Sequence, residues 1–178
     1  MKRNLPFVFL LFWLLPGTAQ EKVKGPVIEG YGEVWDIPGA TYKTNTSGMF
    51  RAVFDVMNSP EDPGQLNPWM ETAARFLNMH ARAGVPAEQL EVALVVHNKA
   101  STDLLDSAHY EEQFGVPNPN EGLLRELMDA GVQVLFCGQS SMARGVPIEE
   151  TVEGVQLSLS ATTALIQLQE SGYHLIKF

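Results

Sequence analysis

The segment from Leu90 to His97 constrains the possible folds of this chain more than any other part of it. Its residues, Leu-Glu-Val-Ala-Leu-Val-Val-His, are nearly all apolar, and several of them are β-branched. A short apolar run of this kind is typical of a strand that is buried on both faces of a sheet. Such strands occur mainly in α/β proteins, in which helices cover a parallel sheet on both sides.

The rest of the chain repeats the alternation of strand and helix that such a sheet requires. We expect four further strands, at residues 51–56, 132–136, 154–159 and 173–178. Helix starts between them are marked by Asn67-Pro68, by Asn118-Pro119-Asn120-Glu121 (an N-cap, a proline at the first helical position and a capping-box acid) and by Ser160. The pattern predicts an α/β fold, a three-layer α/β/α sandwich around a mainly parallel five-stranded sheet, and leaves the strand order open.

The chain divides into three segments. Residues 1–19 combine basic Lys2 and Arg3, a short apolar run and small residues at their end, which is the pattern of a secretory signal peptide. Because a membrane span needs ~20 apolar residues, we expect cleavage, no stable membrane insertion afterwards and a periplasmic or secreted protein; an uncleaved anchor is the alternative. Residues 20–47 have no clear period and predict an irregular N-terminal arm. Residues 48–178 form the single α/β domain.

The charge balance and the cysteine count exclude whole classes of protein. The chain has 21 acidic and 12 basic residues, a net charge of −9. An acidic domain repels phosphate backbones, so we expect no nucleic-acid partner. Cys137 is the only cysteine, so no intramolecular disulfide can form in an oxidising compartment. A lone thiol in that compartment is either buried and inert or kept for chemistry.

His97 and Cys137 each stand at the carboxyl end of a predicted strand, where parallel sheets bind their ligands. A thiol reacts as the thiolate, which requires a lowered pKa. We therefore expect Cys137 to be the reactive residue, with His97 and Arg144 as electrostatic support. The backbone N–H groups of the turn that follows the cysteine would hold an anion if they open a short helix. Predicted binding residues flank the two strand ends: Asn98, Lys99, Gly138, Gln139 and Ser140.

Each of these residues also has a structural interpretation. Cys137 would be a small core side chain, His97 a strand-end histidine bonded to backbone, and the residues after His97 a solvated loop. A zinc or copper site made of Cys137, His97 and His109 is a further alternative. Because no paired-ligand spacing is present, we expect no metal and no cofactor. Asn78 and His80 are expected on a helix surface.

The loop Cys137-Gly138-Gln139-Ser140-Ser141-Met142-Ala143-Arg144-Gly145 resembles the active-site loop of the DsrE/DsrF-like family, in which a cysteine at a strand end is followed at this spacing by Arg-Gly. The resemblance extends over roughly residues 50–178, through Val95-Val96-His97, Asn118-Pro119-Asn120 and the stretch from Leu165 to Tyr173. It implies a DsrE-like fold, assembly as a trimer or hexamer and, as in the sulfur-relay members, a cysteine that carries sulfur as a persulfide. Those members are cytoplasmic, so the leader indicates an exported branch.

Two classes of function follow. The first is an exported sulfur carrier, a possible sulfurtransferase, that takes sulfur onto Cys137 from an unknown donor and passes it to an unknown acceptor. The second is a non-catalytic oligomeric module that binds a small ligand, or a thiol redox sensor, with the same fold. We expect a homo-oligomer on either reading, because the sheet has two edges and the arm offers Tyr31 and Trp35 to cover surface between subunits.

Overall fold

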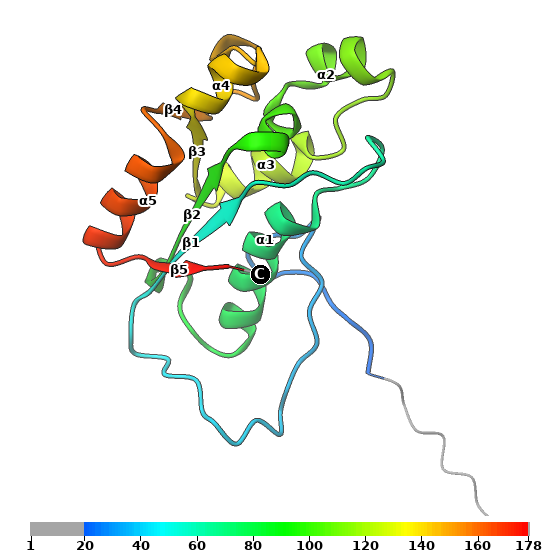
Figure 1. Ribbon diagram of the computed structural model, residues 1–178. Helices are drawn as coiled ribbons and strands as arrows, with labels where there is room; N and C mark the ends of the chain where they lie inside the picture. The colour runs from blue at the N-terminus through cyan, green and yellow to red at the C-terminus, as the bar shows by residue number, and fades with distance from the viewer. Residues whose placement is uncertain (1–19, 178) are drawn as a thin grey trace, which may run out of the picture.

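The computed structural model describes residues 20–177. Residues 1–19, which hold the predicted signal peptide, and residue 178 lie outside the described residues. Figure 1 shows a sheet with helices on both of its sides and a long N-terminal arm. Within residues 20–177, no helix combines the length and the apolar character that crossing a bilayer requires.

Five strands form the sheet, in the order β4–β3–β2–β1–β5, and every pair of neighbours is parallel. The strands are β1 (Phe50–Val56), β2 (Leu90–Val96), β3 (Gln133–Cys137), β4 (Gln156–Ser158) and β5 (His174–Ile176). All five predicted strands are present. The two edge strands are shorter than expected, because each has only one neighbour and pairs with it over three residues.

The helices cover both faces of the sheet and confirm the three layers. They are α1 (Pro68–Arg82), α2 (Ser107–Phe114), α3 (Glu121–Asp129), α4 (Gly138–Arg144) and α5 (Ala161–Glu170), with short 3₁₀ helices at Ala87–Gln89, Asn98–Leu104 and Ile148–Glu150. On one face α1 packs on β1 and β2, and α3 packs on β3. On the other face α5 contacts β1, β2 and β3. Figure 1 shows α2 and α4 beyond the carboxyl ends of the strands.

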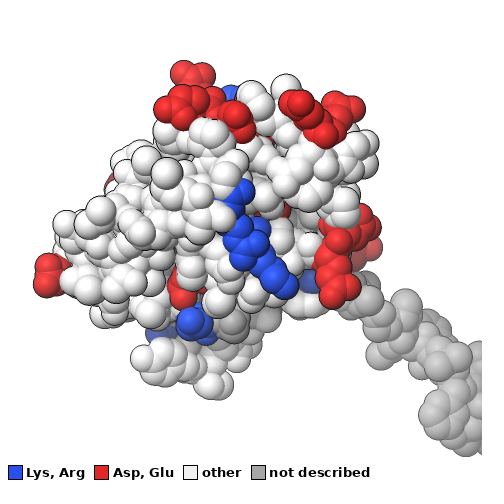
Figure 2. Space-filling view, turned by 45° about the horizontal axis from the view of Figure 1, so that its top comes forward, with Lys and Arg blue, Asp and Glu red and all other residues white. Residues whose placement is uncertain are grey.

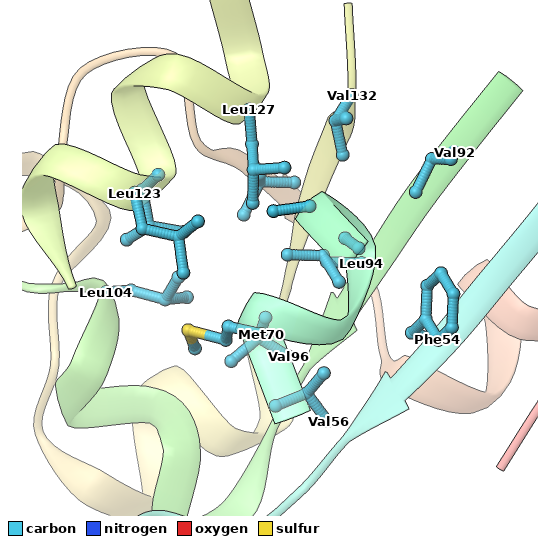
Figure 3. Packing of buried hydrophobic residues seen from close by; sticks show 14 of the residues in the cluster. Phe54, Val56, Met70, Val92, Leu94, Val96, Leu104, Leu123, Leu127 and Val132 are labelled. Atoms are coloured by element: carbon cyan, nitrogen blue, oxygen red, sulfur yellow. The ribbon is translucent and has the colours of Figure 1, made fainter. Parts of the chain in front are cut away.

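Side chains of the central strand β2 alternate between two apolar clusters. Val92, Leu94 and Val96 pack in the larger cluster, together with side chains of α1 and α3 (Figure 3). Ala93 and Val95 pack in the smaller cluster, together with side chains of α5. All five are buried. Burial on both faces is the physical reason for the nearly continuous apolar run in this part of the sequence.

The predicted start of α3 is wrong. The helix begins at Glu121, with Asn120 as its N-cap and no hydrogen bond from the side chain of the cap. Asn118, the predicted cap, donates from Nδ2 to the backbone oxygen of Asp103 at 2.9 Å. Glu121, the predicted capping-box acid, accepts a hydrogen bond from the Ser107 N–H at 2.8 Å. Asn118 Oδ1 still accepts locally from the Asn120 N–H at 2.8 Å, but this bond closes a turn before the helix, and the Asn118 NH₂ and the Glu121 carboxylate bond partners distant in sequence.

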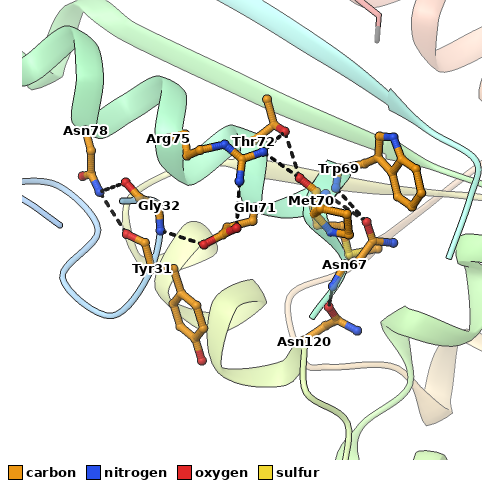
Figure 4. A network of polar contacts seen from close by, with 11 residues as sticks. Tyr31, Gly32, Asn67, Trp69, Met70, Glu71, Thr72, Arg75, Asn78 and Asn120 are labelled. Carbon is orange, nitrogen blue, oxygen red and sulfur yellow. Dashed lines mark hydrogen bonds and ion pairs between the residues drawn. The ribbon is translucent and has the colours of Figure 1, made fainter. Parts of the chain in front are cut away.

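The N-terminal arm is held on α1 by Asn78, which corrects the expectation of a surface position (Figure 4). The Asn78 side chain is fully buried. It accepts from the Ile28 N–H at 2.9 Å and donates to the backbone oxygens of Ile28 and Gly32 at 2.9 and 3.1 Å. An irregular segment has unpaired backbone groups, and a primary amide supplies both a donor and an acceptor for them. His80 is half-buried and bonds the Phe76 backbone oxygen at 2.8 Å.

Candidate functional site

The carboxyl ends of β3 and β4 mark the point at which the chain changes sides of the sheet. After β3, the chain packs on the α1 and α3 side through Val146 and Val152, whereas after β4 it enters α5 on the opposite side. In open α/β sheets, ligands bind outside the strand ends at such a point. Cys137 ends β3 and is paired with Ser158, the last residue of β4. The topology therefore places the cysteine at the expected ligand position.

Gly138 allows the end of β4 to approach the cysteine closely. A Cβ at this position would lie 2.7 Å from the backbone oxygen of Ser158 and 3.3 Å from that of Leu159. Both are backbone atoms, which cannot move aside without shifting the strand end. A glycine here lets α4 start directly after Cys137 while β4 stays paired with β3.

Hydrogen-bond donors converge on the Cys137 thiol, although the residue is only 4% exposed. Burial raises the pKa of this thiol, but the Ser140 hydroxyl and the backbone N–H groups of Ser140, Ala161 and Gln139 outweigh burial, so that the pKa of Cys137 is below its ordinary value. These N–H groups belong to the first turns of α4 and α5, where the helix dipole is positive. The site can therefore hold an anionic sulfur.

The segment after β2 fixes the Ser140 hydroxyl. The Asn98 N–H donates to Ser140 Oγ at 3.0 Å, which leaves the hydroxyl proton free to point at the thiol. Asn98 has a φ of 55°, a left-handed conformation that asparagine adopts more readily than most residues. Its side-chain oxygen accepts a hydrogen bond from the Arg144 guanidinium. Asn98 and Arg144 thus brace α4 against the end of β2.

His97 forms a hydrogen bond with Asp55 that sequence reasoning missed. Its Nε2 lies 2.7 Å from Asp55 Oδ1, and the second oxygen of Asp55 accepts from Lys177 Nζ at 3.0 Å. Burial raises the pKa of Asp55, but the hydrogen bonds from Lys177 and His97, together with their charges, hold that pKa below its ordinary value. The available signal was the charge of Asp55 within the apolar strand Phe50–Val56. We call Asp55, His97, Asn98, Cys137, Ser140 and Arg144 the Cys137 cluster.

The other predicted residues lie around this cluster. Lys99 is exposed, and Gln139 Nε2 donates to the Leu159 backbone oxygen at 3.4 Å. His109 belongs to α2, where its Nδ1 lies 2.8 Å from Asp106. Among residues 20–177, no group of three or more His, Cys, Asp and Glu side chains is arranged to hold a metal ion.

A second polar cluster lies beyond the carboxyl ends of β1 and β2 and is closed to solvent. We call it the Asp103 cluster; its members are Ser59, Asn67, Asp103, Asn118 and Asn120. Asp103 is 2% exposed, and its carboxylate accepts from the Ser59 hydroxyl and from Asn67 Nδ2. Burial raises the pKa of Asp103, and these two hydrogen bonds only partly oppose it. Asn67 also caps α1 (Figure 4), so this cluster ties loops and helix starts together.

Comparisons with known proteins agree with this fold. The model of the DsrE/DsrF-like family matches residues 51–178. No curated protein matches the chain. Two solved structures are similar: the protein of unknown function MTH1491 from Methanobacterium thermoautotrophicum (18% identity, TM-score 0.54, 72% of this chain and 99% of that one) and the ychN protein from E. coli (19%, 0.54, 73% and 100%). At these identities the likeness extends to the fold alone.

Proposed function

The chain belongs to the DsrE/DsrF-like family, and from this premise we propose that it is an exported sulfur carrier whose Cys137 accepts sulfur as a persulfide and passes it on. One observation carries the proposal. The Cys137 thiol sits at the switch point of the sheet, and a hydroxyl and three backbone N–H groups lower its pKa despite burial. A lowered pKa increases the fraction of thiolate at a given pH, and the thiolate is the form of cysteine that acts as a nucleophile.

The proposed transfer needs no external oxidant or reductant. The Cys137 thiolate attacks the terminal sulfur of a donor persulfide, R–S–SH. A new S–S bond forms on Cys137 as the donor S–S bond breaks, and R–S⁻ leaves and takes up a proton. The product is the Cys137 persulfide and a donor thiol. In the second step an acceptor thiolate attacks the outer sulfur of Cys137, which returns as the thiolate.

The neighbouring residues support each stage in this proposal. The N–H groups of Gln139, Ser140 and Ala161 stabilise the anionic sulfur before attack and after release. His97 takes the thiol proton. Arg144 bonds Asn98 and so holds the segment after β2 against α4. Arg144 and the exposed Lys99 also add positive charge around the Cys137 cluster.

Intact mass measurement tests the proposal. The chain from residue 20 onward is treated with a polysulfide and weighed beside Cys137→Ser. We expect a gain of one sulfur atom that a reductant removes and that the Ser variant lacks. Equal uptake by both proteins, or no uptake by either, would overturn the carrier function.

The alternative, a non-catalytic module that binds a small ligand, is favoured by the small exposure of Cys137, 4%. Under this alternative the native thiol reacts slowly with an uncharged alkylating reagent, and unfolding is needed to release it. Rapid alkylation of the folded protein at neutral pH would exclude the inert thiol. A redox sensor that pairs two chains through Cys137 would instead give a dimer on a non-reducing gel.

We also propose that the protein is a homo-oligomer, a trimer or hexamer, assembled through the face made of α4, β4 and α5. Residues 154–169 contain no charged side chain, and Figure 2 is largely white over this side of the molecule. Leu159 and Met142 are 73% and 85% exposed there, and β4 is an edge strand. Because each copy is acidic, with 21 acidic against 12 basic residues in the full chain, copies repel least where the surface is uncharged.

Light scattering tests the assembly. We expect an oligomer that Leu159→Lys dissociates and that Tyr42→Lys, a change at the fully exposed Tyr42 of the arm, leaves intact. A monomer mass for the unaltered protein would refute the proposal.

Export to the periplasm or medium is tested separately: the protein recovered from cells should begin near residue 20, whereas an intact Met1 in the cytoplasm would contradict it.

A further inference from the structure

Three polar side chains form a row on the α5 face of the sheet, where the other inward side chains are apolar. Asp55 follows Val53 on β1 at the spacing of two that returns a side chain to the same face, and Cys137 packs in the cluster under α5 with Val53. His97 follows Val95 at the same spacing, and its backbone is extended, with φ −156° and ψ 178°. The row therefore contains one residue from each of three neighbouring strands.

The register places His97 between the other two residues. Val95 is paired with Asp55 on one side and with Leu135 on the other. Two residues farther along, His97 is level with Cys137 on the adjacent strand, and adjacent strands are about 4.8 Å apart. By register, His97 thus lies between Asp55 of β1, whose carboxylate it bonds, and the position of Cys137 at the end of β3.

Asp55 determines which imidazole nitrogen carries the proton. Its carboxylate is held between His97 Nε2, at 2.7 Å, and Lys177 Nζ, at 3.0 Å, and the side chain is 8% exposed. A carboxylate has no proton to give, so Nε2 of a neutral imidazole must be the donor. Nδ1 is then the nitrogen with a free lone pair, able to accept a proton.

We propose that Asp55 is a positioning residue for sulfur transfer: it orients His97 and fixes the tautomer in which Nδ1 accepts the proton of the Cys137 thiol. This inference rests on the proposed function. The proton moves from Sγ to Nδ1 before the thiolate attacks, and the imidazolium returns it to the leaving R–S⁻. Asp55 touches neither the sulfur nor the donor.

The charged groups around His97 come from several elements. Asp55 lies on β1, Lys177 follows β5 and contacts only the far oxygen of Asp55, and Arg144 of α4 bonds the adjacent Asn98. Lys99 lies two residues farther along and is exposed. The first turn of α5, Ala161-Thr162-Thr163, is uncharged. Asp55 is therefore the only carboxylate that bonds the imidazole in the described residues.

The substitution Asp55→Asn tests this assignment because Lys177 dictates how the new amide sits. The ammonium has only donors, so it retains the amide oxygen, and the amide NH₂ then faces His97 Nε2. The imidazole must accept there and carries its proton on Nδ1, the wrong tautomer. General-base contributions are about 10²–10⁴-fold, so we expect sulfur uptake at neutral pH to fall by about tenfold or more and its pH profile to change shape.

Glu91→Gln is the matched control. Glu91 forms a 2.7 Å ion pair with Arg51 across the same two strands, β1 and β2, at their other end. This variant loses an acid and an ion pair of similar length, and we expect an unchanged pH profile. An Asp55→Asn profile equal to that of the unaltered protein would overturn the inference, as would a Glu91→Gln profile altered to the same extent.

Two further readouts separate this inference from the carrier function. Alkylation of Cys137 by an uncharged reagent over a pH series tests the proton acceptor without any sulfur donor. If Asp55→Asn has the same alkylation profile as the unaltered protein, the inference is overturned even if sulfur is taken up. Nitrogen NMR of the unaltered protein reports the His97 tautomer, with His97→Gln used to assign the signals, so the test survives a variant that fails to fold. A proton on Nδ1 in the unaltered protein would overturn the assignment.

Discussion

The Asp103 cluster and the Cys137 cluster both lie beyond the carboxyl ends of the strands, and they differ in whether their donors and acceptors satisfy one another. In the Asp103 cluster the donors and acceptors satisfy one another, and among the described residues no buried side-chain nitrogen or oxygen lacks a partner. In the Cys137 cluster a hydroxyl and three N–H groups face a sulfur atom. A neutral thiol is a weak acceptor, so this second arrangement favours an anion. The first cluster holds the fold together, whereas under the proposed function the second prepares Cys137 for reaction.

The largest effect that separates the two clusters is expected from Asn67→Ala. Asn67 accepts from the Trp69 and Met70 N–H groups at the start of α1 and donates to the Asp103 carboxylate at 2.6 Å. Loss of the cap and of a donor to a buried carboxylate should lower the free energy of unfolding by about 2–4 kcal/mol. Urea denaturation measures it. Asn45→Ala, which removes an exposed local hydrogen bond to the Ser47 N–H, is the control and should cost far less.

Sulfur uptake by the folded fraction of Asn67→Ala should be retained, because Asn67 forms its hydrogen bonds with residues outside the Cys137 cluster. A loss of sulfur uptake no larger than the loss of folded protein would mean that the two clusters act separately. Uptake abolished in protein that is still folded would show that the two clusters are not separate.

The next effect is expected from Gly138→Ala. The new Cβ would lie 2.7 Å from the Ser158 backbone oxygen, so the end of β4 or the start of α4 must move. Overpacking of this kind costs about 1–3 kcal/mol, and it should displace the N–H groups that face the thiol and slow its alkylation. Gly39→Ala is the matched control, since nothing lies within 4 Å of its Cβ position. Normal alkylation by Gly138→Ala would mean that the strand end yields without affecting the thiol.

A pH series should give opposite slopes for the two aspartates. The pKa of Asp103 is raised by burial above its ordinary value of 3.8, so the folded state holds that proton more tightly than the unfolded state. Its contribution to stability is complete below pH 3.8 and is lost as the pH rises through the raised pKa. For Asp55 burial is outweighed by Lys177 and His97, which lower the pKa. Its contribution is present above pH 3.8 and is lost as the pH falls through the lowered pKa.

Urea denaturation from acid to neutral pH checks both slopes. Asp103→Asn should remove the loss of stability on the alkaline side of this range, and Asp55→Asn should remove the loss on the acid side. If the stability of Asp103→Asn and that of Asp55→Asn depended on pH in the same way, the assignment of a raised pKa to Asp103 and a lowered pKa to Asp55 would be wrong.

Local sequence signals predicted the elements better than the contacts between them. The apolar run from Leu90 to His97 and the capping pairs at Asn67 and Ser160 were sufficient to place a strand and two helices, since each signal is contained within a few residues. The family loop and the strand ends predicted His97 and Cys137 as site residues, and the structure places the two residues at the ends of β2 and β3. The start of α3 was predicted too early, because Asn118 closes a turn with Asn120 ahead of the helix and Glu121 bonds Ser107, which is distant in sequence.

The role of Asp55 could not be predicted for a related reason. Its contact with Lys177 joins residues 122 positions apart and exists only because β5 pairs with β1. The sequence left the strand order open, so the neighbours of each strand end were unknown. Asn78 was misplaced in the same way, because the arm that it binds carries no periodic pattern. Residues whose roles depend on the order of strands or on an irregular segment are thus the ones that local signals miss.

The smallest effect concerns two neighbouring serines of α4, one in the Cys137 cluster and one whose hydrogen bond only supports the fold. The Ser140 hydroxyl lowers the pKa of Cys137, whereas the buried Ser141 hydroxyl donates to the Val146 backbone oxygen at 2.7 Å. Ser140→Ala should raise the pKa of the thiol and slow its alkylation several-fold at a pH below that pKa, with little change in stability. Ser141→Ala should cost about 1 kcal/mol of stability and leave the alkylation rate unchanged. Equal alkylation rates for the two variants would mean that the backbone N–H groups of α4 and α5 alone maintain the thiolate, and that Ser140 only fastens the Asn98 segment.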